Sequence, residues 1–580
     1  MGAEFRALQF NSHPDQGTFQ GGNPLIFDPT STAGAWYNYP NGFNNLGNAF
    51  ASFLLGDVFR ATNTTPDPEY GRRKAFSVYA SDTIKVNPRL TINLSLRWDY
   101  NNPYKEKYGH WSSFVTDVSN PVTGLQGEYQ YLSNGSQSFE TRQDWFNYAP
   151  HIGAAYMLTN KTVLRGNYAV FYVPLNLNTY GGIPYQTSGN PGFYEQSTES
   201  SFNWGGGYNP ILSQVKTPDY TQYGPVSIDP RALTPGNTEQ YNIGIQRELD
   251  RSSTFEANWI QSASYHLQSG IFRNNQPTVA NLQNYLINGT YPASYNGYYQ
   301  GVGASYAGIT PYPQVAAGFG PLYSVGTPLG NGDYKSVQLS ITRRVAQGLS
   351  ALGSYNWSRA HGDVDSNFEE LYYAGSLQNI YDLKDERKDI LDFDETHIVK
   401  GYIIYNLPFG RGQRFVGDSG RVMDAIVGGW STDFNFHYNT GTPISLHSSN
   451  SYPGFQSVYA NIAPNCNLTT GHKGIGQTFI NTSCFSNPDA ATGTLGNGQN
   501  FQPGVRNPGF SSEDLAAHKS FSAGSDNQYK LTLRMEFYNV FNRAHLAGPI
   551  TNLTDPNYGR ITNYASGGGR VGQFGARFTF

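Results

Sequence analysis

Strict two-residue alternation of apolar and polar side chains is the feature of this sequence that most limits its fold. From Leu90 to Tyr100 every even position is apolar or aromatic, and every odd position from Thr91 to Asp99 is polar. A helix would mix the two sets on each face, whereas a β-strand separates them because successive side chains point to opposite sides. The pattern recurs over 430–439 and 530–537. The chain is therefore predicted to be all-β.

Fourteen segments of this kind are predicted as antiparallel strands. They span residues 3–11, 73–84, 90–101, 146–158, 162–173, 237–249, 253–266, 335–346, 349–360, 395–407, 427–440, 513–522, 528–541 and 570–580. Most are long enough for the roughly 9–11 residues that a tilted strand needs to cross a bilayer.

The links between these segments alternate in length. Short links, such as 159–161 and 250–252, alternate with long links, such as 174–236 and 441–512. Outer-membrane barrels have this asymmetry, with short periplasmic turns and long extracellular loops. The link 408–426 is the long exception among the short turns, and residues 46–56 are predicted to form a small helix in a long loop.

Composition excludes several other classes of protein. The chain has 38 Lys+Arg against 42 Asp+Glu, and only 14% of residues are charged, against about 25% in soluble proteins. A nucleic-acid binder would be basic. The sequence lacks the run of about 18 apolar residues that a membrane-spanning helix needs. A barrel can still cross the membrane, and its mean hydropathy stays low because its lumen-facing residues are polar.

The sequence offers no residues for enzymatic chemistry. It has no G-x-S-x-G, phosphate-binding loop, H-E-x-x-H or C-x-x-C pattern. The stretch Gly417-Asp418-Ser419-Gly420 falls in a predicted turn without supporting His and Asp motifs. We expect no catalytic residue and no cofactor.

The last predicted strand ends on an aromatic residue of its apolar face. Phe574, Phe578 and Phe580 alternate with polar residues to the end of the sequence. This arrangement resembles the assembly signal of bacterial outer-membrane proteins. The resemblance implies a bacterial outer-membrane location, with membrane lipid, lipopolysaccharide and the barrel-assembly machinery as partners.

Several short motifs, in order, resemble the TonB-dependent outer-membrane receptors, and most closely the Oar-like subset. They lie at residues 87–91, 96–100, 147–150, 394–397, 407–412, 428–430, 441–443 and 534–542. That family has an N-terminal plug, which contacts TonB, and a barrel of about twenty-two strands. Against this pattern, 1–580 is interpreted as one barrel domain with about fourteen of those strands and no plug. We expect the chain to be the C-terminal portion of a longer receptor. The alternative is that it forms a complete fourteen-stranded barrel.

The resemblance implies active uptake of a scarce solute. Two other functions stay open at this point: a surface adhesion or interaction protein that transports nothing, and a passive pore. A soluble all-β glycan binder is a weaker option.

The long loops are rich in aromatic residues and poor in charge. Residues 274–332 contain no Asp, Glu, Lys, Arg or His. Tyrosine offers rigid contact area with a polar tip, and such a surface suits neutral polar ligands, whereas an anionic chelate would favour Arg or Lys. The candidate ligand-binding residues are Trp204, Tyr208, Tyr298, Tyr299, Tyr306 and Tyr312. The alternative is that these aromatics only pack the loops together.

Two further loop features carry weaker hypotheses. Asp363, Asp365 and Asn367 place oxygen ligands at alternate positions, as calcium prefers, although an EF-hand's glycine and final glutamate are missing; a solvated loop is the plainer account. Cys466 and Cys484 share the loop 441–512, and extracytoplasmic chains keep disulfides. We expect a disulfide between them.

Overall fold

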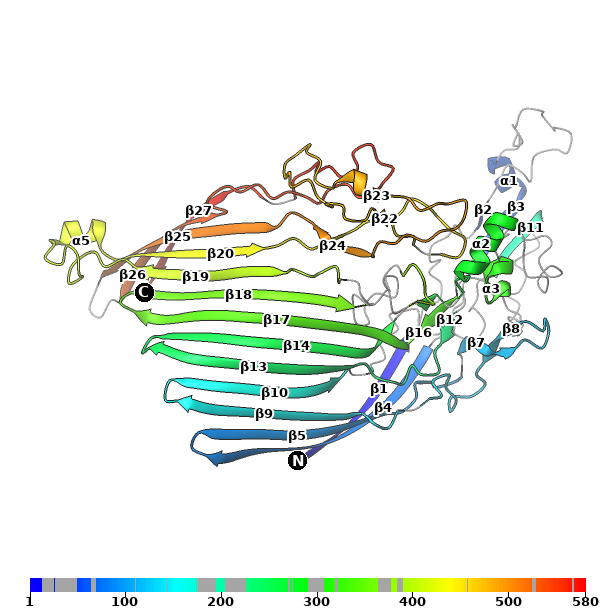
Figure 1. The fold of residues 1–580 in the computed structure, drawn as a ribbon, viewed down its shortest axis with the longest axis horizontal. Helices are drawn as coiled ribbons and strands as arrows, with labels where there is room; N and C mark the ends of the chain where they lie inside the picture. Colours follow the sequence, from blue (N-terminus) through cyan, green and yellow to red (C-terminus); the bar gives the residue numbers. More distant parts are fainter. Residues whose placement is uncertain are drawn as a thin grey trace.

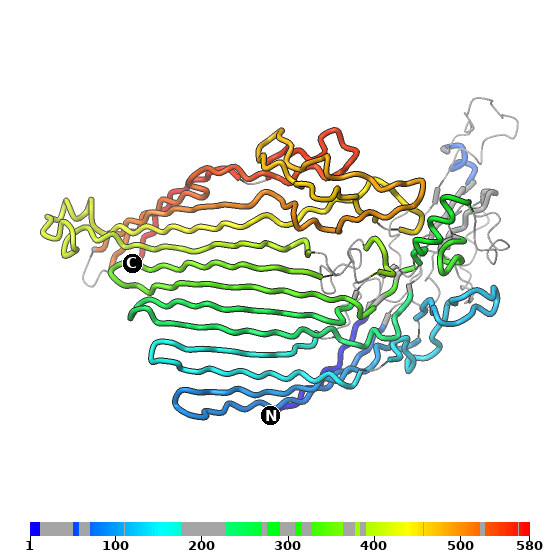
Figure 2. The backbone as a smooth tube through the Cα atoms, in the orientation of Figure 1, coloured from blue at the N-terminus to red at the C-terminus, as the bar shows by residue number. Residues whose placement is uncertain are grey.

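One long antiparallel sheet organises the molecule. The computed structural model describes residues 1–12, 25–26, 49–63, 69–109, 111–142, 144–173, 175, 194–203, 218, 226–269, 272–273, 275–289, 307–318, 322–362, 377–382, 390–455, 457–523, 528–565 and 568–580. The sheet runs in the order of the sequence, each strand pairing with the next along its path. It curls, so that the strands at its two ends are inclined to those in the middle (Figures 1 and 2).

The path of the sheet contains fourteen strands. They are β1 (Gly2–Ser12), β4 (Glu69–Asn87), β5 (Leu90–Asn101), β9 (Tyr148–Thr159), β10 (Thr162–Tyr172), β13 (Asn237–Asp250), β14 (Ser253–Ser269), β17 (Thr327–Ala346), β18 (Leu349–Gly362), β19 (His397–Asn406), β20 (Trp430–Asn439), β25 (Phe510–Ala523), β26 (Tyr529–Tyr538) and β27 (Val571–Thr579). β6 (Lys105–Glu106) adds a fifteenth strand on β4, off the path. The all-β antiparallel fold is confirmed, and each predicted segment corresponds to one strand of the path.

Some strands begin earlier than the alternation indicated, and β17 and β4 differ most. β17 starts at Thr327 rather than at residue 335, because its Gly- and Pro-containing first residues hide the period while still pairing with β14 through register shifts near Leu267. Bulges of this kind insert residues that break a strict period of two. β4 starts at Glu69 rather than at 73, and its early residues pair with the end of β1.

The two faces of the sheet differ as the alternation requires. On β5 the even residues, such as Leu94 (41% exposed) and Leu96 (50% exposed), lie on an uncovered apolar face, which we call the outward face. The odd residues, such as Arg97 and Asp99, lie on the opposite, inward face. A row of exposed aliphatic and aromatic side chains this extensive costs free energy in water and fits an apolar surrounding.

The two ends of the sheet also differ. Tight turns close one end; at Gln347-Gly348 both residues have positive φ, 53° and 79°, the geometry that matches the twist of a two-residue hairpin. The opposite end carries the long connections with α1 (Ala49–Leu55), α2 (Val279–Asn288) and α3 (Pro313–Gly318) (Figure 1). The predicted helix within 46–56 is α1. A further helix, α5 (Arg421–Val427), lies at the turn end.

Short sheets and turns build the loops. They are β2 (Leu25–Ile26), β3 (Asp57–Asn63) and β11 (Tyr194–Asn203); β7 (Ser112–Ser119) and β8 (Gln126–Tyr131); β12 (Val226–Ile228), β15 (Phe272–Arg273) and β16 (Tyr323–Val325); β21 (Pro443–Ser445) and β24 (Phe501–Arg506); β22 (Asn461–Ile462) and β23 (Phe485–Ser486); and the 3-10 turns η5 (Ala307–Ile309) and η6 (Thr482–Cys484). In the described part of the chain, no helix is both long and apolar enough to cross a membrane.

The largest water-excluded clusters lie in these loops rather than between layers of the main sheet. One is built around Leu446, Ile480, Val505 and Ile561, all fully buried, and it includes Cys484. Another surrounds Trp111 and Tyr104, whose rings lie 4.4 Å apart. The loops are therefore folded units with cores of their own.

Candidate functional site

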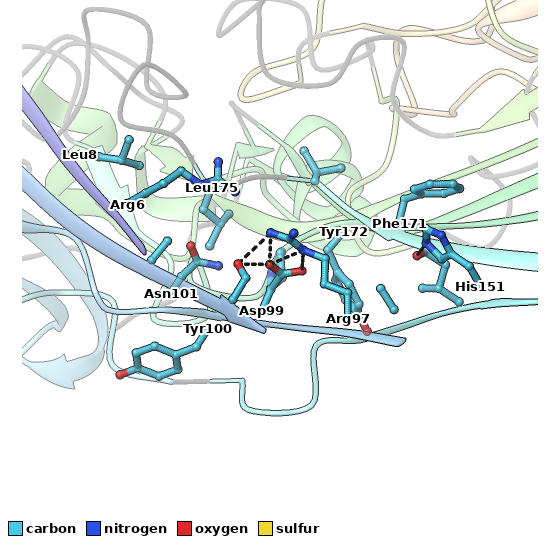
Figure 3. Close-up of a pocket in the computed structure, with 16 residues that line it drawn as sticks. Arg6, Leu8, Arg97, Asp99, Tyr100, Asn101, His151, Phe171, Tyr172 and Leu175 are labelled. Carbon is cyan, nitrogen blue, oxygen red and sulfur yellow. Dashed lines mark hydrogen bonds and ion pairs between the residues drawn. The ribbon is translucent and has the colours of Figure 1, made fainter. Parts of the chain in front are cut away.

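A cavity of about 230 Å³ lies on the inward face near the loop end of the sheet. It is lined by residues of β1, β4, β5, β9 and β10 and by the segment after β10 (Figure 3). Arg97 and Asp99 point toward one another in its middle, whereas Tyr100 points away (Figure 3). Strand alternation explains this difference, since Tyr100 belongs to the outward set.

A row of paired residues across three strands holds the polar centre of the cavity. Glu4 of β1 is opposite Ser77 of β4, and Ser77 is opposite Asp99 of β5. Arg97 precedes Asp99 by two residues and so shares its face. Sequence positions about ninety residues apart thus meet on one wall.

Arg97 links the members of this row. Its Nε donates to both Asp99 carboxylate oxygens at 2.9 and 3.0 Å, and its Nη2 donates to Ser77 Oγ at 2.8 Å and to Glu4 Oε2 at 3.1 Å. Ser77 Oγ in turn donates to Asp99 Oδ1 at 2.6 Å. Arg6 Nε lies 2.9 Å from Glu4 Oε1. Two arginines and two carboxylates therefore make a cluster with no net charge.

Aromatic and imidazole rings flank this cluster. His151 of β9 and Phe171 of β10 have ring centroids 4.7 Å apart, and Nε2 of His151 lies 3.0 Å from the carbonyl oxygen of Val170. The Arg97 guanidinium lies 6.0 Å from the ring centroid of Tyr79. A flat apolar ring beside hydrogen-bonding groups of balanced charge suits a neutral polar molecule better than an ion.

Most of the loop aromatics predicted to bind ligand lie outside the described residues. These are Trp204, Tyr208, Tyr298, Tyr299 and Tyr306. Tyr312 is described, and its ring packs edge-on against Phe114 at 5.4 Å in a loop core. Burial raises the pKa of the Tyr312 hydroxyl above its ordinary value, so that the hydroxyl stays neutral. The structure does not bring Tyr312 to the cavity on the inward face.

The other predicted residues have the following places. Asp363, Asp365 and Asn367 lie outside the described residues, and within the described ranges no three His, Cys, Asp or Glu side chains gather as a metal site. Cys466 and Cys484 are joined as a disulfide with Cα atoms 5.7 Å apart. Phe574, Phe578 and Phe580 are exposed on or just beyond the edge strand β27.

Sequence reasoning did not find the cavity itself. Arg97 and Asp99 were visible as the polar set of one strand, but their meeting with Glu4 and Ser77 depends on strand register. It also did not find the ion pairs that tie loop bases to strand ends, such as Asp394 Oδ2 with Arg506 Nη2 at 2.6 Å. These two residues are 112 positions apart, so no local pattern signals them.

A curled antiparallel sheet with an apolar outward face, a polar inward face, short turns at one end and long loops at the other defines the wall of a transmembrane β-barrel. The chain belongs to the family described as outer membrane beta barrel domain, whose model matches residues 1–573. It is thus a protein of the bacterial outer membrane, and its outward face is the lipid-facing one.

Several solved structures are similar to the chain. They include the FpvAI–pyocin S2 complex (12% identity, TM-score 0.39, 89% of this chain and 38% of that chain), the ferric-catecholate import receptor Fiu from E. coli K12 (14%, 0.36, 88% and 45%) and the unliganded ferric citrate transporter FecA (12%, 0.36, 90% and 47%). The chain spans less than half the length of these proteins. Among curated proteins, no sequence matches it.

Proposed function

We propose that the chain forms the barrel wall and external loops of a receptor that takes up a scarce, neutral polar solute, a glycan or a peptide, through the TonB system. The observation that carries the choice of solute is the charge-balanced cluster of Glu4, Arg6, Arg97 and Asp99 beside Phe171 on the inward wall. In an anion receptor we would instead expect arginines that carboxylates do not neutralise.

In this proposal the loops capture the solute and the inward wall receives it. The loop aromatics Trp204, Tyr208, Tyr298, Tyr299 and Tyr306 supply the capture surface, and the cavity lies where the loops meet the sheet. The motifs that resemble Oar-like receptors support the proposal that TonB supplies the energy for uptake. TonB would act through a plug, which the resemblance implies for the whole receptor. The lipid-facing aromatics that end β27 are proposed as the signal read by the barrel-assembly machinery.

The test is uptake by cells that carry the full-length receptor. Radiolabelled neutral oligosaccharides, neutral peptides and ferric citrate are offered in parallel, with and without TonB. We expect uptake of one neutral class only, lost when TonB is removed. Uptake that persists without TonB would indicate a passive pore, surface binding without uptake would indicate an adhesin, and uptake of ferric citrate alone would contradict the choice of a neutral solute.

A variant connects this uptake to the cavity. Replacing Arg97→Gln removes a charged hydrogen-bonding hub, and we expect uptake to fall about ten-fold. The matched control is Arg165→Gln on β10. Arg165 lies on the inward face, four residues before Ala169, which pairs with His151. Arg165 does not line the cavity, so the control leaves the cavity intact. Equal loss in both variants, with both correctly inserted, would count against the cavity as a solute site.

A further inference from the structure

The link between β19 and β20 is an outlier among the turns of the molecule. The other described hairpin turns at this end are tight, whereas this one runs from Pro408 to Gly429 and contains α5. It lies at the turn end of the sheet, opposite the folded loops (Figure 1). Neither barrel closure nor ligand capture explains a folded protrusion on this side.

The protrusion exposes apolar side chains in unusual density. Val422 is 78% exposed and Ile426 is 63% exposed, and both belong to α5. The other exposed apolar side chains of the turn are Phe409, Phe415, Val416 and Met423. Exposed apolar groups this close together are an interaction surface rather than ordinary surface scatter.

The turn holds these side chains in a fixed arrangement. The Phe409 and Phe415 rings lie 5.4 Å apart, and the Phe415 N–H donates to the Pro408 carbonyl at 3.0 Å. Val416 has a φ of 56°, a conformation that is costly for a β-branched residue and persists only where neighbours impose it. A β-branched side chain is thus presented to the surroundings at the tip of an ordered turn.

The helix is attached to the lipid-facing side of the sheet. Trp430 alternates with Phe434 and Phe436 on the outward face, and Lys519 is its partner on β25. Trp430 Nε1 donates to the Ile426 carbonyl at 2.9 Å, and Lys519 Nζ donates to the same carbonyl at 3.2 Å and to the Gly428 carbonyl. The apolar side chains of α5 are therefore continuous with the surface that meets lipid.

Basic residues surround the apolar ones. Arg411, Arg414 and Arg421 are exposed. Of the two carboxylates in the turn, Asp424 is half-buried and accepts the Arg411 N–H at 2.6 Å, so it is occupied within the turn, whereas Asp418 is exposed. Apolar side chains flanked by arginines are the composition of an interfacial membrane anchor, since arginine pairs with phosphate groups.

We propose that the turn 408–429 is a membrane-interface anchor that binds anionic phospholipid in the periplasmic-facing leaflet. Phe415, Val416, Val422, Met423 and Ile426 enter the boundary between headgroups and acyl chains, and the three arginines contact lipid phosphates. Trp430 and Lys519 fix the depth of the anchor. This proposal depends on the outer-membrane family and not on the transported solute.

The experiment places an environment-sensitive fluorophore on the turn of the full-length protein inserted into vesicles. Val422→Cys is labelled with NBD, and Asp418→Cys in the same turn is the matched control; the native cysteines do not react because they are bonded to each other. Insertion of each variant is verified by heat modifiability on a gel. Vesicles contain phosphatidylcholine with or without phosphatidylglycerol, and a nitroxide near the headgroup quenches labels at that depth.

We expect the label at 422 to shift to the blue and to be quenched by the shallow nitroxide, more strongly with phosphatidylglycerol, while the label at 418 stays in water. Each Arg→Gln change at 411, 414 or 421 should reduce the preference for phosphatidylglycerol about five-fold, and Lys473→Gln in an external loop should not. A label at 422 that stays in water in both vesicles overturns the proposal. So does a blue shift that appears only after soluble periplasmic protein is added, since the partner is then a protein.

Discussion

At the scale of single residues, the buried carboxylate of Asp394 should contribute strongly to stability, because it joins several segments at the base of a loop. It is 1% exposed at its side chain, accepts the Ala360 N–H at 2.7 Å and pairs with Arg506 at 2.6 Å. Asp394→Asn leaves the Arg506 guanidinium without its charge partner, and we expect the free energy of unfolding to fall by about 3 kcal/mol. Urea unfolding in lipid vesicles measures it. Asp392→Asn, two residues away and exposed, should change little, and equal effects would refute the role of the ion pair.

His447 should make the loop after β20 sensitive to acid. Burial lowers the pKa of its imidazole, while its hydrogen bond with Asn500 opposes that shift. Because the folded-state pKa lies below the unfolded value of about 6.5, the loop is fully stable above that pH and loses stability as the pH falls below it. Protection of the described residues within 443–506 against hydrogen exchange, relative to the intrinsic exchange rate at each pH, should therefore fall between about pH 7 and about pH 5. His447→Gln should flatten this dependence, whereas His472→Gln should not.

At the scale of elements, substitutions in one hairpin turn should either destabilise or stabilise the protein, depending on the backbone φ angle at each position. Gly348 has a φ of 79°, and a Cβ there would lie 2.7 Å from the Asn406 carbonyl oxygen. Gly348→Ala should destabilise the protein by about 1–2 kcal/mol. Gln347→Gly relieves a positive φ of 53° and should be neutral or stabilising. If urea unfolding ranks the two variants the other way round, the turn geometry is wrong.

The disulfide of the loop core should control local rather than global stability. Cys466 and Cys484 are 18 residues apart, and closing a loop of that size removes unfolded-state entropy worth about 3 kcal/mol. A Cys466→Ser, Cys484→Ser variant should lose protection from proteases between β20 and β25 while the sheet stays inserted. Reduced wild-type protein should match the variant. Alkylation of both thiols without reductant would show that the bond does not form.

Strands and cores differ in how far the sequence predicts them. The sheet follows from alternation that each strand carries in its own residues, as in 90–101, so fourteen segments could be placed without tertiary information. α5 was missed because it has only about two turns and follows directly on the glycines and charges of 408–420. The loop cores were missed because Leu446, Ile480 and Ile561 meet across more than a hundred residues with no common period.

At the scale of the whole molecule, strand register determines which inward-facing residues meet, and alternation alone does not predict these contacts. Alternation indicates that Arg97 faces inward, but its contacts with Glu4, Ser77 and Asp99 form because these three residues align across three strands. A slip of one residue in any of these strands would turn its members to the lipid side. Our proposal of solute uptake rests on the motifs that resemble TonB-dependent receptors, and our choice of solute class rests on these residues of the wall.

The order of the sheet also fixes how the molecule should come apart under force. Pulling on Phe580 loads the pairs between β27 and β26 one after another, so the chain should lengthen hairpin by hairpin rather than in one event. The stretch between Cys466 and Cys484 cannot extend while the disulfide is intact. The step that releases the loop before β25 should therefore be about 60 Å shorter than its residue count allows, and a reducing agent should restore the missing length.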